Sequence, residues 1–253
     1  MDLQLSGKVV IVTGAGRGHG ESMALALAKE GATVVVVDLN GDNARKVYAQ
    51  IENEGGAGAA CQLDVTQLQA VEEMVHFVKG KFGRVDVLVN NACAAIRRTP
   101  LLDMDICEWD QVIAVNLRGA FICSQAVGRV MKEQRAGRMI NISSFAAGLP
   151  AAGFAAYSAS KAGLEALSKT VSGELGAFGV TAVYVRPGVV ETEFTKPGHE
   201  GDVGEKMRSV IASGRFGTTE ELARVVCFLA SPLAEYINGG PIAVDGGKYV
   251  CQF

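Results

Sequence analysis

Short runs of β-branched residues alternate with amphipathic or alanine-rich stretches along the chain, and this alternation limits the possible folds more than any other feature. Runs such as Val34–Val37 are typical of strands that are buried on both faces. A repeated strand–helix order favours a parallel sheet with helices on both faces, and neither a linker nor an internal repeat interrupts it. We predict a single α/β domain over residues 1–253, built on a doubly wound parallel sheet.

The same pattern places the individual elements. Strands are expected at Lys8–Thr13, Thr33–Asp38, Ala59–Asp64, Val85–Asn90, Arg138–Ser143, Thr181–Arg186 and Ile242–Val244. Helices are expected at Gly18–Glu30, Asp42–Glu54, Leu68–Phe82, Glu108–Glu133, Ser158–Phe178 and Thr219–Leu229. The least regular stretch, Glu191–Arg215, is long for a connection in a compact domain, so we interpret it as a lid over a binding cleft; a plain surface insertion is the alternative.

Composition excludes several classes of protein. The chain has 253 residues and a formal net charge of −3, so it lacks the basic excess that binds nucleic acid. Its apolar runs are too short to span a bilayer, and its first residues do not have the pattern of a signal peptide. The six cysteines form no CxxC pair and no histidine clusters with them, which favours reduced thiols over disulfides or a zinc site. We expect a cytoplasmic protein without a metal, a membrane or a nucleic-acid partner.

A glycine-rich segment, Thr13-Gly14-Ala15-Gly16-Arg17-Gly18-His19-Gly20, joins the first strand to the first helix. Glycines allow a sharp turn and the close approach of a pyrophosphate. The helix N-terminus adds N–H donors and the positive end of the helix dipole. Because the segment follows a strand and opens a helix, it predicts a dinucleotide site that includes Gly14, Gly18 and Gly20.

Asp38, at the end of the second strand, indicates which dinucleotide binds. A carboxylate there accepts hydrogen bonds from the ribose 2′-hydroxyl of NAD and repels the 2′-phosphate of NADP. Arg17 is a counter-signal, because a guanidinium in the glycine segment could hold that phosphate. We favour NAD(H) over NADP(H); the alternatives are a strand-end turn residue for Asp38 and a solvated cation for Arg17.

Tyr157 and Lys161 are the candidates for the chemistry, because residues four positions apart share one helical face. A free tyrosine has a pKa of about 10, and a nearby ammonium would lower it. The pair could then exchange a proton with a carbonyl or an alcohol oxygen. Ser144 follows a strand at the edge where such sheets bind ligands, unless it merely ends that strand. Asn116 lies mid-helix, where an amide is a poor helix former, which hints at a local hydrogen bond.

Together these motifs resemble those of the short-chain dehydrogenase/reductase family, and the resemblance runs from Leu5 to Gly247. It implies a Rossmann-type fold and an oxidoreductase that needs no metal. Its motifs are the TGxxxGxG segment, Asp38, Asp64-Val65, Asn90-Asn91-Ala92, Asn116, Ser144, Tyr157, Lys161, Pro187-Gly188 with Thr192, and Asp245-Gly246-Gly247.

The resemblance also implies roles. Tyr157 is the acid/base, Lys161 lowers its pKa and holds the nicotinamide ribose, and Ser144 positions the substrate oxygen. Asn116 anchors, through its backbone, a water that relays protons. The implied cofactor contacts are Gly14, Arg17, Gly18, His19, Gly20, Asp38, Leu39, Asp64, Val65, Asn90, Ala92, Tyr157, Lys161, Pro187, Gly188, Val190 and Thr192.

The implied substrate pocket is mainly apolar and suits a hydrophobic or moderately polar ketone or secondary alcohol. Arg97 and Arg98 near its rim would attract an anionic substrate, although exposed arginine pairs are usually just solvated. The implied pocket residues are Cys93, Ala94, Ile96, Ser144, Phe145, Ala146, Phe154, Val189 and Phe194.

Two positions depart from the family pattern. Cys93 stands where the family has glycine, so its side chain could intrude on the pocket. His19 occupies the middle of the GxG triplet and would bring an imidazole near the pyrophosphate or the nicotinamide. Neither change touches the acid/base group.

We therefore expect an NAD(H)-dependent oxidoreductase that interconverts a secondary alcohol and a ketone. The alternatives are an NADPH-dependent 3-oxoacyl reductase and, in another class, a catalytically silent dinucleotide-binding scaffold protein. Small residues in the Tyr157 helix permit close helix contact, and the resemblance implies a homotetramer or a homodimer. These small residues are Ala159, Ala162, Gly163, Ala166 and Gly173.

Overall fold

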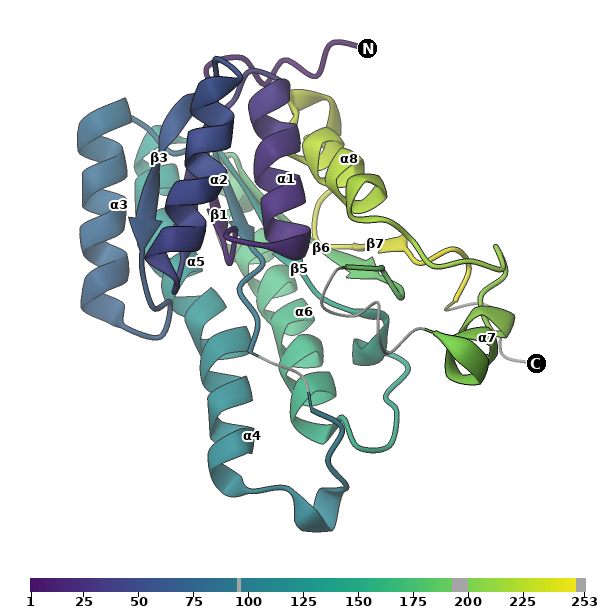
Figure 1. The fold of residues 1–253 in the computed structure, drawn as a ribbon. Coiled ribbons are helices and arrows are strands. Elements are labelled where there is room, and N and C mark those ends of the chain that lie inside the picture. Colours follow the sequence, from purple (N-terminus) through teal and green to yellow (C-terminus); the bar gives the residue numbers. More distant parts are fainter. Residues whose placement is uncertain (95–96, 193–199, 249–253) are drawn as a thin grey trace.

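A seven-stranded parallel sheet forms the centre of the computed structural model, which describes residues 1–94, 97–192 and 200–248 (Figure 1). The strand order is β3-β2-β1-β4-β5-β6-β7, and each neighbouring pair is parallel. The predicted doubly wound sheet is therefore confirmed. The strands are β1 Val9–Thr13, β2 Thr33–Asp38, β3 Ala57–Gln62, β4 Val87–Asn90, β5 Gly137–Ile142, β6 Val180–Pro187 and β7 Pro241–Val244.

Helices cover both faces of the sheet. Figure 1 shows α1, α2 and α8 along one side, while α3, α5 and α6 pack on the other. Short 3₁₀ turns occur at Leu101–Asp103, Phe145–Ala147, Gly176–Phe178 and Pro232–Ala234. The helices are α1 Gly18–Lys29, α2 Gly41–Asn53, α3 Leu68–Phe82, α4 Ile106–Ile113, α5 Ala120–Gln134, α6 Ala155–Leu175, α7 Gly201–Ser209 and α8 Thr219–Ala230.

Alternate residues of each central strand enter different cores, because successive side chains of a strand point to opposite faces. In β1, Val10 and Val12 pack with α1, α2 and α8, whereas Val9 and Ile11 pack with α3 and α5. All four side chains are buried. The continuous apolar runs in the sequence thus correspond to strands that are covered on both sides.

Three segments differ from the sequence prediction. The helix expected over Glu108–Glu133 consists of α4 and α5, joined by a π-helical turn at Ala114–Gly119. α6 begins earlier than expected, so Tyr157 lies in its first turn. The stretch expected to be irregular, Glu191–Arg215, contains α7, and its residues 193–199 lie outside the described part of the chain.

Candidate active site

The strand order reverses between β1 and β4, and the glycine segment lies at the carboxyl end of β1, where open α/β sheets bind ligands. α1 begins at Gly18, and its N-cap residue Arg17 makes no side-chain capping bond, so backbone N–H groups remain for an anionic ligand. Gly14 and Gly18 have φ of 62° and 58°, which favours glycine. A Cβ atom on Gly14 would lie 2.8 Å from the Ala92 Cα. These features fit a dinucleotide phosphate.

Asn91 fastens the β4 loop to the glycine segment, a role that sequence reasoning missed. Its side-chain amide donates to the carbonyls of Thr13 and Gly14, each at 3.0 Å. Its backbone N–H and that of Ala92 donate to the Thr13 hydroxyl at 3.0 and 3.1 Å. The family motif had included Asn91, but only its neighbours Asn90 and Ala92 were expected to contact the cofactor.

Asp38 ends β2 beside the glycine segment, as the sequence predicted. One carboxylate oxygen accepts the Gly16 N–H at 2.8 Å, and the other accepts the Asn40 N–H at 2.9 Å. A Cβ atom on Gly16 would lie 2.8 Å from this carboxylate. The two backbone bonds fix the carboxylate next to the loop.

The other expected cofactor residues occupy several positions around this edge. A small hollow is lined by Thr13, Val65, Asn90, Ala92 and Asn116, which groups three of them. The Asn90 amide is buried and donates to Ser124 and Asn141, so that side chain serves the core. Thr192 lies beside Gly18, and Val190 pairs with Gly217 in an isolated bridge.

Four further expected contacts have ordinary local surroundings. The Asp64 carboxylate accepts the backbone N–H and the hydroxyl of Thr66 at 2.9 and 2.8 Å. Leu39 is largely exposed. Pro187 ends β6, and the Gly188 N–H that follows it donates to the Val244 carbonyl at 2.9 Å.

The structure brings Tyr157, Ser144 and Lys161 together. Burial raises the pKa of the Tyr157 phenol, the charge of Cys93 raises it further, and a hydrogen bond with Ser144 lowers it. The Lys161 ammonium donates to the Ile142 carbonyl at 2.8 Å and lies 5.7 Å from the centre of the Tyr157 ring. Burial is the largest influence on the Tyr157 pKa in this arrangement, and the Lys161 ammonium is hydrogen-bonded to a backbone carbonyl. That Lys161 lowers the pKa of Tyr157 stays a prediction.

Asn116 sits in the π-helical turn and links the β4 loop to the catalytic helix. Its carbonyl oxygen accepts the Ala94 N–H at 2.9 Å, and its amide donates to the Ser160 hydroxyl at 3.1 Å. Ser160 in turn donates to the Tyr157 carbonyl at 2.7 Å. The hydrogen bonding that the mid-helix amide suggested is present, and it is made by the side chain.

The two departures from the family pattern both lie near the catalytic pair. Burial lowers the pKa of His19, and the Lys161 charge lowers it further. Cys93 is exposed and close enough to influence Tyr157 electrostatically. Neither position was expected to carry the reaction, and each is linked electrostatically to one residue of the catalytic pair.

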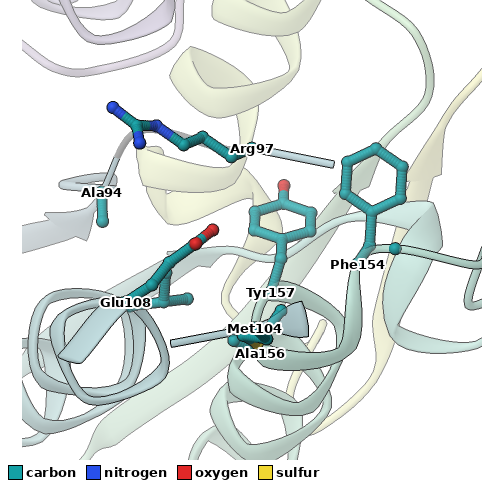
Figure 2. Close-up of a pocket in the computed structure, with 9 residues that line it drawn as sticks. Ala94, Arg97, Met104, Glu108, Phe154, Ala156 and Tyr157 are labelled. Carbon is teal, nitrogen blue, oxygen red and sulfur yellow. The ribbon is translucent and has the colours of Figure 1, made fainter. Parts of the chain in front are cut away.

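A hollow opens beside the Tyr157 ring (Figure 2). Its lining includes Ala94 and Phe154 from the predicted pocket, whereas Ile96 and Phe194 lie outside the described residues. The pocket was predicted to be mainly apolar, but Arg97 and Glu108 also line it. Glu108 was missed because it comes from α4, far from Tyr157 in the sequence. The remaining lining residues are Met104, Val112, Gly153 and Ala156.

The described residues have no helix that is long and apolar enough to cross a membrane. Across the same ranges, no group of three or more His, Cys, Asp or Glu side chains is arranged to hold a metal ion.

Known proteins share this architecture over nearly the full length. The chain is 38% identical to the D-threitol dehydrogenase of Mycolicibacterium smegmatis, over 97% of this chain and 94% of that protein. It is 42% identical to the 3-oxoacyl-[acyl-carrier-protein] reductase of Synechocystis, over 96% and 97%. The crystal structure of an NAD⁺-bound xylitol dehydrogenase superposes with a TM-score of 0.93 and 29% identity, covering 96% of this chain and all of the other.

A family model described as enoyl-(acyl carrier protein) reductase matches residues 14–248, from the glycine segment to the end of the described chain. That span contains the sheet edge, the Tyr157–Lys161 pair and the loop after β6. The family match, the relatives and the site geometry agree, and the chain belongs to the short-chain dehydrogenase/reductase family of oxidoreductases.

Proposed function

We propose that this protein interconverts a secondary alcohol and a ketone with NAD(H), with Tyr157 as the general acid/base. One observation carries the proposal: the Tyr157 phenol, whose pKa a hydrogen bond with Ser144 lowers, lines a pocket with Ala94, in the loop that Asn91 joins to the glycine segment. A phenol and a hydroxyl that converge on one point can together hold a single substrate oxygen.

The proposed steps follow from these side chains. In reduction, Tyr157 donates its proton to the carbonyl oxygen while the Ser144 hydroxyl orients that oxygen. In oxidation, the phenolate removes the proton of the alcohol. Lys161, whose ammonium is buried 5.7 Å from the Tyr157 ring centre, favours the phenolate electrostatically as it forms. The nicotinamide, when bound, accepts or supplies the hydride.

Asp38 supports NAD(H) as the preferred cofactor. Its carboxylate is fixed beside the glycine segment by two backbone N–H groups, where it would accept hydrogen bonds from a ribose 2′-hydroxyl and repel a 2′-phosphate. The NAD⁺-bound xylitol dehydrogenase structure shares the fold. The residues that would hold the cofactor are those of the glycine segment, Asp38, Ala92, Lys161 and the Gly188–Thr192 loop.

A second candidate is an NADPH-dependent 3-oxoacyl reductase. The 42% identity to the Synechocystis enzyme favours it, and so does Arg17, the N-cap residue of α1 within the glycine segment. We rank it second because the carboxylate of Asp38 opposes a 2′-phosphate directly.

Cofactor and substrate preferences are tested together. Turnover of a panel of secondary alcohols with NAD⁺ and NADP⁺, and of the matching ketones and a 3-oxoacyl thioester with NADH and NADPH, is followed by absorbance. We expect higher kcat/KM with NAD(H); a strong NADPH preference with the thioester would reverse the ranking. Tyr157→Phe should bind NADH normally and lose turnover by about 10²–10⁴-fold.

We further propose that the enzyme is a cytoplasmic homotetramer of single-domain subunits, with residues 191–215 as a lid. Large apolar side chains are exposed at the start of α4 and on α5, including Leu101, Leu102, Ile106 and Phe121. Small residues on α6, such as Ala162 and Ala166, are exposed as well. Such surfaces are typical of subunit interfaces.

A further inference from the structure

The pocket beside Tyr157 contains a carboxylate that the proposed proton transfer does not use. Glu108 lies in the first turn of α4 and lines the pocket with Tyr157. Figure 2 shows the Glu108 carboxylate and the Tyr157 hydroxyl directed into the same space, with the Arg97 side chain across from them.

Glu108 is held in place but keeps acceptor capacity. The Thr99 hydroxyl lies 3.2 and 3.3 Å from the two carboxylate oxygens, and its single proton can serve only one of them at a time. No lysine or arginine in the described ranges forms an ion pair with Glu108. An ionised carboxylate accepts about four hydrogen bonds. The Glu108 oxygens can therefore accept further hydrogen bonds from a ligand in the pocket.

Arg97 is a hydrogen-bond donor, whereas Glu108 is an acceptor. Its side chain is exposed, lines the same pocket and can only donate hydrogen bonds. The remaining wall is formed by Met104, Val112 and Phe154, which suit a carbon skeleton. A ligand that matches both the polar side chains and the apolar wall has a carbon skeleton with several hydroxyls, because a hydroxyl can donate to Glu108 and accept from Arg97.

We propose that Glu108 accepts a hydrogen bond from a second hydroxyl of the substrate, so that this site prefers a polyol over a simple alcohol. The proposal rests on the function proposed above and names its substrate class. An aliphatic acyl chain at this position would strip water from the carboxylate without replacing it, which is costly. Glu108 is then the residue that separates a polyol dehydrogenase from an acyl reductase.

Two four-carbon substrates test the proposal. We would measure kcat/KM for butane-2,3-diol and for butan-2-ol with NAD⁺, in the wild type and in the variants Glu108→Gln and Glu108→Leu. The comparison is between the two substrates for each protein. A hydrogen bond to a charged group contributes about 1.5–3 kcal/mol, so Glu108→Leu should lose about 10–100-fold on the diol and little on butan-2-ol. Glu108→Gln, which keeps one acceptor oxygen, should lose less. Asp110→Asn, an exposed neighbour on α4, is the matched control and should change neither substrate.

Binding is measured in parallel, by saturation-transfer NMR of the same two alcohols with the enzyme–NADH complex. A wild type that shows no diol preference in turnover and binding, or a Glu108→Leu variant that loses equally on both substrates, overturns the proposal. Failure of the proposed function has a different signature: Tyr157→Phe would keep its activity, or wild type would oxidise no alcohol in the panel.

Discussion

Tyr157 lies in surroundings that disfavour its phenolate, since burial raises its pKa above the ordinary value. Below that pKa the phenol is protonated, so it can donate to a ketone but cannot take the proton of an alcohol. We therefore predict that kcat/KM for alcohol oxidation rises with pH into the alkaline range, whereas ketone reduction falls only when the phenol ionises.

Measuring kcat/KM against pH for one alcohol and for its ketone checks the direction of each pH dependence. Ser144→Ala should shift the pH at which the oxidation rate rises to a higher value, because the Ser144 hydrogen bond lowers the Tyr157 pKa. An oxidation rate that falls steadily from neutral to alkaline pH, in a protein that remains folded, would contradict the assignment of Tyr157.

Cys93 offers a second test at the residue scale. It is exposed and acts electrostatically on Tyr157, whereas burial raises the pKa values of Cys123 and Cys227 to about 12. We predict that iodoacetamide inactivates the wild type, because the added group would fill the space next to Tyr157. Cys93→Ser should keep its activity under the same treatment, and Cys107→Ser should remain sensitive. Equal inactivation of wild type and Cys93→Ser would contradict the prediction.

Some of these residues could be predicted from the sequence and some could not. Tyr157 and Ser144 belong to motifs with fixed spacing around a strand end and a helix start. Glu108 has no such signal, because its helix reaches the pocket only through the tertiary fold. Asn91 had a signal in its motif, but nothing in the sequence indicates that its amide would bind two carbonyls of another loop.

At the scale of elements, a buried ion pair connects the catalytic helix to β6. Arg186 donates two hydrogen bonds to Glu165, at 2.7 and 2.6 Å, and the Ser143 hydroxyl donates to the same carboxylate at 2.9 Å. Glu165 lies one turn beyond Lys161, and Arg186 directly precedes Pro187. The pair therefore fixes α6 relative to the loop expected to contact the nicotinamide.

We predict that Glu165→Leu destabilises the protein by about 3–5 kcal/mol, because it removes the carboxylate that accepts two hydrogen bonds from the largely buried Arg186 guanidinium. The double variant Glu165→Leu/Arg186→Met should recover part of that loss. Chemical denaturation of both variants measures the difference in the free energy of unfolding. A double variant less stable than Glu165→Leu alone would contradict this prediction.

The elements themselves were largely predictable, and the exceptions have physical causes. Strand and helix positions follow from periodicity, which the central valine runs display strongly. The π-helical turn was not predicted, because it is stabilised by Asn116 bonds to Ala94 and Ser160, which are distant in sequence. α7 was also missed, since Gly201–Ser209 buries only Gly204 and so lacks a clear apolar stripe.

At the scale of the whole molecule, the proposed tetramer follows from surfaces that a monomer would leave in water. Leu102 is 96% exposed and Ile106 is 72% exposed. We predict that light scattering after gel filtration gives four times the chain mass of 26.5 kDa. Ala166→Arg should shift the mass to that of smaller species, and Glu73→Arg on α3 should not. A wild-type mass of 26.5 kDa would contradict the proposal.

The overall architecture was the most predictable level, because a parallel sheet covered on both faces leaves a strong imprint of short apolar strands between amphipathic helices. The quaternary arrangement and the substrate are indicated only weakly by the sequence. They depend on side chains such as Leu102 and Glu108, whose surroundings are set only once the helices are packed.

The contact between Gly16 and Asp38 bears on how such enzymes change cofactor over evolutionary time. A Cβ atom at position 16 would lie 2.7 Å from the Asn43 Cβ and 2.8 Å from the Asp38 carboxylate, whose oxygens already accept the Gly16 and Asn40 N–H groups. Substitutions at positions 16, 38 and 43 are therefore expected to be epistatic. A phosphate-binding side chain at position 16 fits only once both the Asp38 carboxylate and the Asn43 side chain have been replaced or displaced.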